Sequence, residues 1–372
     1  MVSRTAPHAA FLAVLTVASV LAVHAPFLLN STEFLGVPIH QTGPQVPARY
    51  LDGPLYAVVS QTFYSPSPVY SFDPEIPREY YAAHLILYPA SIRILSLAFG
   101  PFDAMLLATA VFAVLAVLAF YFLVRDFGYS RHPLLLSSFF VFFPARWLVY
   151  HSVGATEPAF IFLSIASLYF FKKGRFFPSA LLASLAMLTR ITGILLFAFY
   201  LVYFLWKRRN GLASDFLPYL LIPAALAAHF FLYLCQFGDF FAYFAVNNYL
   251  LAPPLSIVYY GNPSYGEFAF LLYALYAAGT VELFRQRRHD LFLLSLLFVL
   301  PTVFLFHNDL SRYLLPAAPF ALLIAFEPLL TSKEFRPVLA ILAVTAVFYA
   351  WSVIPYNLLP ASEFEALKAL IK

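Results

Sequence analysis

The stretch AAFLAVLTVASVLAVHAPFLL, residues 9–29, decides the class of fold to which this chain belongs. A helix of about 20 apolar residues is long enough to cross the hydrocarbon core of a bilayer. The run is too long for the apolar part of a secretory signal peptide, and it lacks an A-x-A cleavage site. We therefore expect a retained membrane anchor, followed by a polar loop.

The rest of the chain repeats this apolar pattern. Of its 372 residues, 62% are hydrophobic and 11% are charged, whereas soluble domains have about 25% charged residues. The basic residues lie between apolar runs, so orientation in the bilayer explains the net charge of +4 better than nucleic-acid binding does. We predict one all-α domain over residues 1–372, a polytopic membrane bundle of about 11 transmembrane helices. The further apolar runs are 102–124, 134–150, 157–171, 178–189, 192–206, 216–236, 268–284, 291–306, 313–330 and 338–354.

Segment 178–206 allows two topologies, one long helix or a hairpin of two short helices. Basic clusters flank it on both sides, and the positive-inside rule favours the hairpin because it returns both clusters to the cytoplasm. The expected topology therefore has a cytoplasmic amino terminus and an external carboxyl terminus. The basic residues then assigned to the cytoplasmic face are Arg4, Arg125, Arg131, Lys172, Lys173, Arg175, Lys207, Arg208, Arg209, Arg285, Arg287, Arg288, Lys333 and Arg336.

This topology places four segments on the outer face. They are the region 30–100, the turn near Glu157, the loop 237–267 and the turn 307–312. Within the first, residues 85–99 are apolar but carry Arg93, which indicates an amphipathic helix lying in the interface. Long outer loops beside a helical bundle are where we expect a binding surface, although many of their tyrosines belong to an interfacial aromatic belt.

The first outer region contains Arg49-Tyr50-Leu51-Asp52-Gly53-Pro54-Leu55-Tyr56. Its Gly-Pro pair turns the chain directly after Asp52. A carboxylate held at such a turn near the membrane surface is suited to act as a general base or a ligand. The alternative is that Asp52 only caps the short helix that starts at Pro54.

Four charged residues lie inside apolar runs or at their ends, where each costs about 2.5–3.5 kcal/mol. Glu157, Arg190 and Arg312 fall near the outer face, on the same side as Asp52, whereas Arg146 lies within its run. Two guanidiniums and two carboxylates suit an anionic lipid phosphate, since the planar guanidinium binds phosphate bidentately. The alternatives are that the arginines extend to the headgroups, above all Arg146, and that Glu157 caps its own helix.

Weaker candidates for a substrate or metal contact are Asp73, Glu75, His84 and Asp239. Two carboxylates spaced as Asp73-x-Glu75 are more often solvated, and a lone His beside apolar residues is more often structural. The sequence has no Gly-rich phosphate loop and no recognisable metal motif, although a divalent cation stays an open possibility. A transferase that lacks a phosphate loop needs a donor that the membrane carries.

An ordered set of short motifs resembles certain GT-C glycosyltransferases, most of all the second GPI mannosyltransferase family and its prokaryotic relatives. The resemblance implies an inverting enzyme that moves mannose or another hexose from a polyprenyl or dolichyl phosphate to an acceptor hydroxyl on the outer face. It also implies that Asp52 is the general base. Glu157 is a second candidate catalytic carboxylate, and from their charge we expect Arg190 and Arg312 at the donor phosphate. The motifs are Asp52, Leu87-Tyr88-Pro89, Thr156-Glu157-Pro158, Leu188-Thr189-Arg190 with Thr192-Gly193, Gly238-Asp239 and Arg312-Tyr313-Leu314-Leu315-Pro316.

Two other classes of protein compete with this interpretation. A secondary transporter or lipid flippase often shows internal repeats and broken helices near the midplane. The hydropathy pattern shows no such repeat, and the polar residues gather at one membrane face. A purely structural subunit does not account for charged residues at four positions of the motifs quoted above. The sequence therefore favours the transferase, whose partners are the lipid-linked sugar, membrane lipids and a glycan, lipid or protein acceptor.

Overall fold

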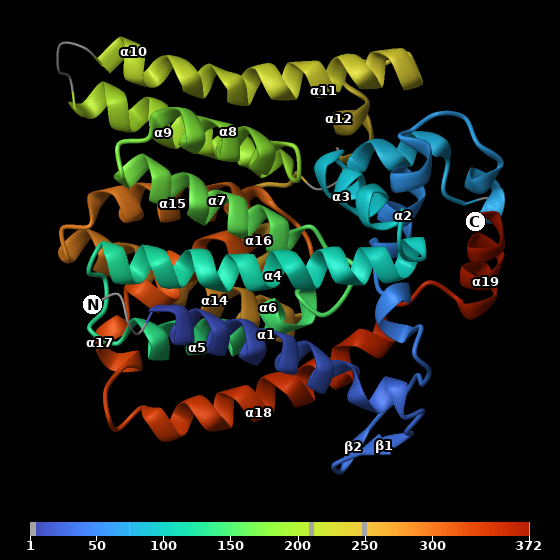
Figure 1. Cartoon of the computed structure of the whole chain (residues 1–372), viewed down its shortest axis with the longest axis horizontal. Coiled ribbons are helices and arrows are strands. Elements are labelled where there is room, and N and C mark those ends of the chain that lie inside the picture. Colours follow the sequence, from blue (N-terminus) through green and yellow to red (C-terminus); the bar gives the residue numbers. More distant parts are fainter. Residues whose placement is uncertain (1–4, 74, 208–211, 248–250, 372) are drawn as a thin grey trace.

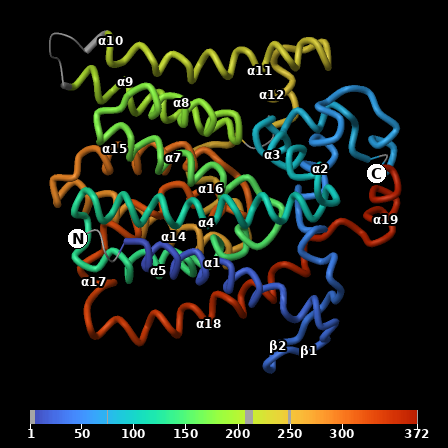
Figure 2. Tube along the Cα trace, viewed as in Figure 1, coloured from blue at the N-terminus to red at the C-terminus, as the bar shows by residue number. Residues whose placement is uncertain are grey.

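The computed structural model describes residues 5–73, 75–207, 212–247 and 251–371. Within these ranges the chain is a bundle of helices, and its sheet consists of two strands of two residues each (Figures 1 and 2). The helices run roughly parallel to one another, and short helices gather at one end of the bundle (Figure 1). Arg4, Arg208 and Arg209, which the sequence assigned to the cytoplasmic face, lie outside the described residues.

Five helical stretches in the described ranges are long and apolar enough to cross a membrane. They correspond to predicted runs and confirm the helical membrane bundle. The other helices are shorter and pack inside the bundle. For example, α7 (Glu157–Lys172) lies between the long helix α4 (Pro101–Asp126) and α8 (Phe176–Met187), and contacts both. The long stretches are α1 (Thr5–Leu28), α4 (Pro101–Asp126), Ser214–Phe237, which includes α11 (Leu221–Phe237), α14 (Pro263–Arg285) and Arg336–Tyr356, which includes α18 (Arg336–Val353). The shorter helices of the bundle are α5 (Pro133–Phe142), α6 (Ala145–Tyr150), α7 (Glu157–Lys172), α8 (Phe176–Met187), α9 (Ile194–Lys207), α10 (Leu212–Phe216), α15 (His289–Val299), α16 (Leu310–Leu314) and α17 (Glu327–Leu330).

Two predicted runs are broken rather than continuous. Run 134–150 forms α5 and α6, which meet at Pro144, a residue that has no N–H to continue a helix. Run 313–330 divides into α16, a 3-10 turn, a π-helical stretch at Pro319–Ile324 and α17. This stretch packs closely against α14. A Cβ built on Gly279 of α14 would lie only 1.7 Å from the carbonyl oxygen of Ala321. Only glycine permits that approach.

Segment 178–206 is the predicted hairpin, since α8 and α9 are separate helices joined by residues 188–193. A cavity of about 450 Å³ brings Lys172, Phe204, Asp215 and Asp290 together. The turn before α8 and the end of α9 therefore lie at the same end of the bundle. We call this the basic end, and the amino terminus lies there too (Figure 1).

The opposite end, called the site end, carries the outer segments predicted from the sequence and the carboxyl terminus (Figure 1). The predicted amphipathic helix is α3, which buries Tyr88 and Ile92 and exposes Arg93 and Ile94. Other elements of the outer segments are β1 (Glu33–Phe34), β2 (Val37–Pro38), a 3-10 turn at Val46–Arg49, α2 (Gly53–Thr62), 3-10 turns at Pro68–Phe72 and Arg78–Ala83, α3 (Leu87–Leu95), α12 (Ala242–Asn247), α13 (Ser256–Tyr259) and α19 (Ala361–Leu370).

Candidate active site

Asp52 is held in place from both of its flanks. Before it, the Leu51 N–H donates to the Asn357 carbonyl at 2.9 Å, and Leu51 adopts a left-handed φ of 47°. After it, Gly53 begins α2 and packs against the Gly154 backbone, where a Cβ would meet the Gly154 oxygen at 3.3 Å. Residues far apart in the sequence thus fix the backbone on which the carboxylate sits.

The Asp52 side chain does not cap α2. It occupies the N-cap position but makes no capping hydrogen bond. Its Oδ2 atom instead accepts a hydrogen bond of 3.3 Å from Nη1 of Arg312. The capping alternative is therefore not what the structure shows, and 31% of the Asp52 side chain remains exposed.

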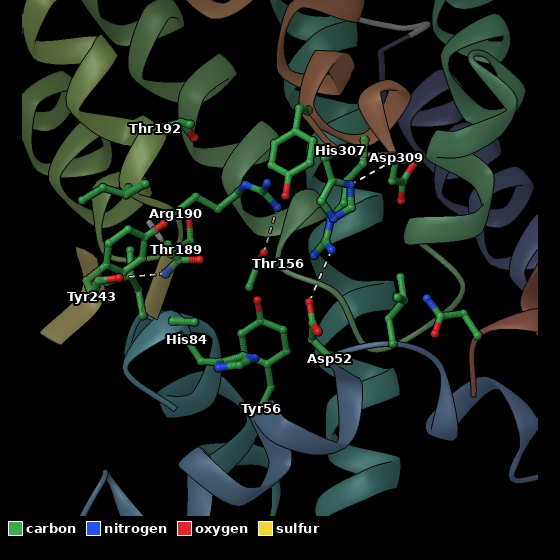
Figure 3. A pocket seen from close by; sticks show the side chains of 18 of the residues that line it. Asp52, Tyr56, His84, Thr156, Thr189, Arg190, Thr192, Tyr243, His307 and Asp309 are labelled. Atoms are coloured by element: carbon green, nitrogen blue, oxygen red, sulfur yellow. Dashed lines mark hydrogen bonds and ion pairs between the residues drawn. The ribbon is translucent and has the colours of Figure 1, made fainter. Parts of the chain in front are cut away.

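Glu157 lies at the centre of the charged cluster and is 1% exposed. Its Oε1 atom accepts hydrogen bonds from Arg190 and, at 2.5 Å, from Nε of Arg312. Glu157 is the first residue of α7, and the N-cap residue Thr156 makes no capping hydrogen bond. Thr156 Oγ1 instead accepts from Arg190 at 3.3 Å (Figure 3). One buried carboxylate thus serves as the counter-ion of two arginines.

Arg146 does not extend alone to the headgroups. It pairs with both carboxylate oxygens of Asp309, a residue that sequence reasoning missed. Tyr150 donates to the same carboxylate at 2.5 Å, and its ring lies 5.2 Å from the Arg146 guanidinium and 4.9 Å from that of Arg312. The physical reason is that a guanidinium in an apolar run needs a counter-ion. That need, together with the polar turn 307–312, was the signal that could have found Asp309.

These charged groups border a cavity of about 470 Å³ at the site end. Asp52, Tyr56 and His84 lie on one side of it, and Arg190 and His307 lie across from them (Figure 3). Glu157 is not among the lining residues, so it meets the cavity only through its arginines. Further polar lining residues are Arg146, Thr156, Thr189, Thr192, Tyr243, Asn247, Tyr265, Asn308, Asp309, Arg312, Tyr313 and Asn357.

Two histidines of the lining are held in the neutral form. Burial lowers the pKa of His84, although the charge of Asp52 opposes this effect. Burial also lowers the pKa of His307, against the charge of Asp309. His307 Nδ1 accepts the Asp309 backbone N–H at 3.0 Å, so the neutral ring carries its proton on Nε2. Burial and the charge of Asp52 raise the pKa of Tyr56, which keeps its hydroxyl proton.

The other predicted candidates lie outside the cavity lining. Asp73 Oδ1 accepts the Glu75 backbone N–H at 2.9 Å, and Asp239 Oδ1 accepts that of Phe241 at 2.8 Å. Such local turns are a common structural use of Asp. Within the described ranges no three His, Cys, Asp or Glu side chains gather as metal ligands. We derive no step through a divalent cation.

Comparison with known proteins identifies the fold. No protein-family model and no curated protein sequence matches the chain. Among solved structures, the chain is similar to ArnT from Cupriavidus metallidurans, which was crystallised bound to undecaprenyl phosphate. The similarity has a TM-score of 0.54 and 13% sequence identity, and it covers 97% of this chain and 77% of that one. The two chains share the GT-C membrane fold expected from the motifs, whereas the mannosyltransferase family stays a prediction.

Proposed function

We propose that the protein is a glycosyltransferase that takes its sugar from a polyprenyl-phosphate donor. The observation that carries this proposal is a partly exposed carboxylate, Asp52, that shares one cavity with two largely buried arginines in a GT-C fold. The similar ArnT chain holds undecaprenyl phosphate, which supports an isoprenoid phosphate as donor. The motif resemblance adds mannose or another hexose as the sugar.

In the proposed reaction Asp52 acts as general base. An acceptor hydroxyl attacks the anomeric carbon of the donor, the bond from that carbon to the phosphate oxygen breaks, and prenyl phosphate leaves. Asp52 orients the hydroxyl and accepts its proton late in the step. A single direct displacement inverts the anomeric configuration. The exposure of Asp52 supports this role, because a base must reach its substrate.

Arg190 and Arg312 are proposed to bind the donor phosphate. An arginine has five N–H donors. In this structure Arg312 donates one hydrogen bond to Glu157 and one to Asp52. The remaining donors and the positive charge suit the phosphate that carries the negative charge after transfer. We propose that Glu157, which is buried and does not line the cavity, positions these arginines rather than touching substrate.

The proposed reaction takes place at the outer face, with the amino terminus in the cytoplasm. Thiol labelling checks this in a Cys235→Ser background. A cysteine at Ser71, in the first outer region, is expected to react with a membrane-impermeant reagent added to intact cells. A cysteine at Gly174, at the basic end, is expected to be shielded. The opposite pattern would reverse the proposed orientation.

The reaction itself is tested with purified protein in lipid. Radiolabelled prenyl-phosphate sugars that differ in the hexose are supplied with a membrane extract as acceptor, and release of prenyl phosphate is followed. We expect one donor to be consumed by the wild-type protein and not by Asp52→Asn. Equal release by the two proteins would remove Asp52 from the chemistry.

A further inference from the structure

A second cavity, of about 870 Å³, lies at the site end but away from Asp52. Gln61, near the end of α2, lines it, whereas Asp52 directly precedes α2. A helical rise of 1.5 Å per residue separates these two positions by about 13 Å along the helix. The cavity is therefore distinct from the candidate active site, and an inference about it does not depend on the proposed reaction.

Helix α19 closes this cavity against the start of α4. Phe364 of α19 packs on Phe102 of α4, with ring centroids 4.6 Å apart. Leu97, Phe99 and Leu106 give the lining an accessible apolar part, whereas Phe102 and Phe364 are buried against each other. Since α4 is one of the spanning helices, its first turn marks the level at which the chain enters the membrane.

The polar part of the lining is cationic on balance. Arg93 and Lys368 carry positive charge, and Asp103 carries negative charge. Arg93 is held in place because its Nη1 donates to the Gln61 side-chain oxygen. Gln61 in turn donates to Ser60 Oγ at 3.0 Å and to Ser96 Oγ at 3.4 Å. A guanidinium held in this orientation is positioned to bind a phosphate group.

Exposed apolar side chains stand beside the cavity. Ile94, Leu97 and Phe99 of the α3–α4 corner all project from the surface of the bundle. An amphipathic segment of this kind lies in the interface, with its apolar residues among the acyl chains and its basic residue at the phosphate level. Both an acyl chain and a charged headgroup can therefore reach the cavity from the bilayer.

We propose that this cavity is a binding site for an anionic phospholipid. Arg93 and Lys368 contact the headgroup phosphate, and an acyl chain lies along Leu97, Phe99 and Leu106. The occupant is a lipid rather than a free phosphate anion, because the apolar part of the lining requires hydrocarbon to cover it. Bound lipid fills the space between α19 and the first turn of α4.

The test uses native mass spectrometry of the full chain in a neutral detergent, titrated with phosphatidylglycerol. Each interfacial basic residue contributes about 1 kcal/mol toward an anionic lipid, so Arg93→Gln with Lys368→Gln is expected to weaken binding roughly thirtyfold. Gln61→Leu keeps the net charge but releases Arg93, and a several-fold loss is expected. The matched control is Arg285→Gln, an exposed arginine of the basic end, which is expected to bind like wild type.

Four outcomes would overturn the proposal. Unchanged affinity in the double variant removes the site. An equal loss in Arg285→Gln shows a general charge effect, as does wild-type affinity in Gln61→Leu. Competition by millimolar glycerol 3-phosphate as effective as that of the lipid would indicate a soluble phosphate ligand instead. Phosphatidylcholine serves as the neutral reference and is expected to bind wild type and the double variant alike.

Discussion

Both ends of the bundle pair their charges, but they do so in different surroundings. At the basic end Asp126 meets Arg125 and Lys173, whose side chains are 30% and 40% exposed. At the site end Glu157 is 1% exposed and holds two arginines that are themselves largely buried. Ion pairs near water cost little to make and stabilise little. Buried ones need several favourable contacts to offset the loss of hydration.

The difference indicates what each end does. The charges of the basic end suit orientation of the chain in the membrane, where position matters more than geometry. The charges of the site end are fixed in direction and face a cavity, with Asp52 left partly exposed beside Arg312. Charges that are buried and oriented in this way are typical of sites that act on a charged substrate.

The largest contrast between the ends is expected at Asp52. Asp52→Asn keeps the shape of the side chain but removes its charge and its ability to accept a proton. Turnover should fall by roughly 10²–10⁴ while donor affinity changes little. Steady-state kinetics and donor binding on the same folded preparation check this. Turnover at the wild-type rate would move the base to another carboxylate.

Glu157→Gln is expected to have the next largest effect, and chiefly on stability. It leaves two buried guanidiniums without their shared counter-ion, so the free energy of unfolding should fall by about 3 kcal/mol. Thermal unfolding in detergent measures the loss. Turnover should fall less than in Asp52→Asn, because Glu157 acts through the arginines. A variant as stable as wild type would show that the ion pairs of Glu157 do no more than offset the cost of burying its charge.

Arg190→Ala and Arg312→Ala are expected to weaken donor binding. Each removes a charge-assisted contact worth about 1.5–3 kcal/mol, which corresponds to ten- to a hundredfold in affinity. Arg146→Ala should instead act on folding, because it leaves the largely buried Asp309 carboxylate without its ion-pair partner. Binding of a labelled donor to each variant separates the two effects. Wild-type donor affinity in both Arg190→Ala and Arg312→Ala would exclude them from the phosphate site.

His84 is expected to make stability depend on pH. Its folded pKa lies below its ordinary value of 6.5, so its contribution is fully present above pH 6.5. As pH falls below 6.5, the unfolded chain takes up the proton first, and up to about 1.4 kcal/mol is lost per pH unit until the folded pKa is reached. Thermal unfolding at pH 7.5 and 5.5 should show a smaller pH dependence in His84→Gln. An equal dependence would contradict the buried neutral state.

The smallest effect is expected at the basic end, from the change that matches Glu157→Gln. Asp290→Asn removes a carboxylate that pairs with Lys172, where the two side chains are 17% and 20% exposed. Stability should change by less than about 1 kcal/mol and turnover not at all. A turnover loss as large as that of Glu157→Gln would erase the contrast between the two ends.

The helices could largely be predicted from the sequence, because long apolar runs have few other stable forms in a membrane. The breaks at Pro144 and at the π-helical stretch were not predicted, since they depend on packing such as that of Gly279 on Ala321. For the site, the motifs selected Asp52, Glu157, Arg190 and Arg312, which the structure brings together.

What the sequence could not supply was the pairing within the site. Arg146 and Asp309 are 163 positions apart, and the sequence around either residue does not indicate that the other is its partner. The same holds for Glu157, whose burial and two arginine partners could not be read from its motif. Asp73 and Asp239 accept backbone N–H groups in local turns, a use of Asp that the sequence alone does not distinguish from ligand binding.

The most direct test of the central claim uses a polyprenyl-phosphate hexose labelled with one isotope in the sugar and another in the phosphate. Wild-type protein is placed in sealed lipid vesicles with an acceptor extract, and the two labels are followed separately. If the protein is a transferase, the two labels separate: the sugar label moves to the acceptor and the phosphate label remains on the prenyl lipid. Labels that stay together, and above all labels that cross the bilayer together, would contradict it and indicate a flippase.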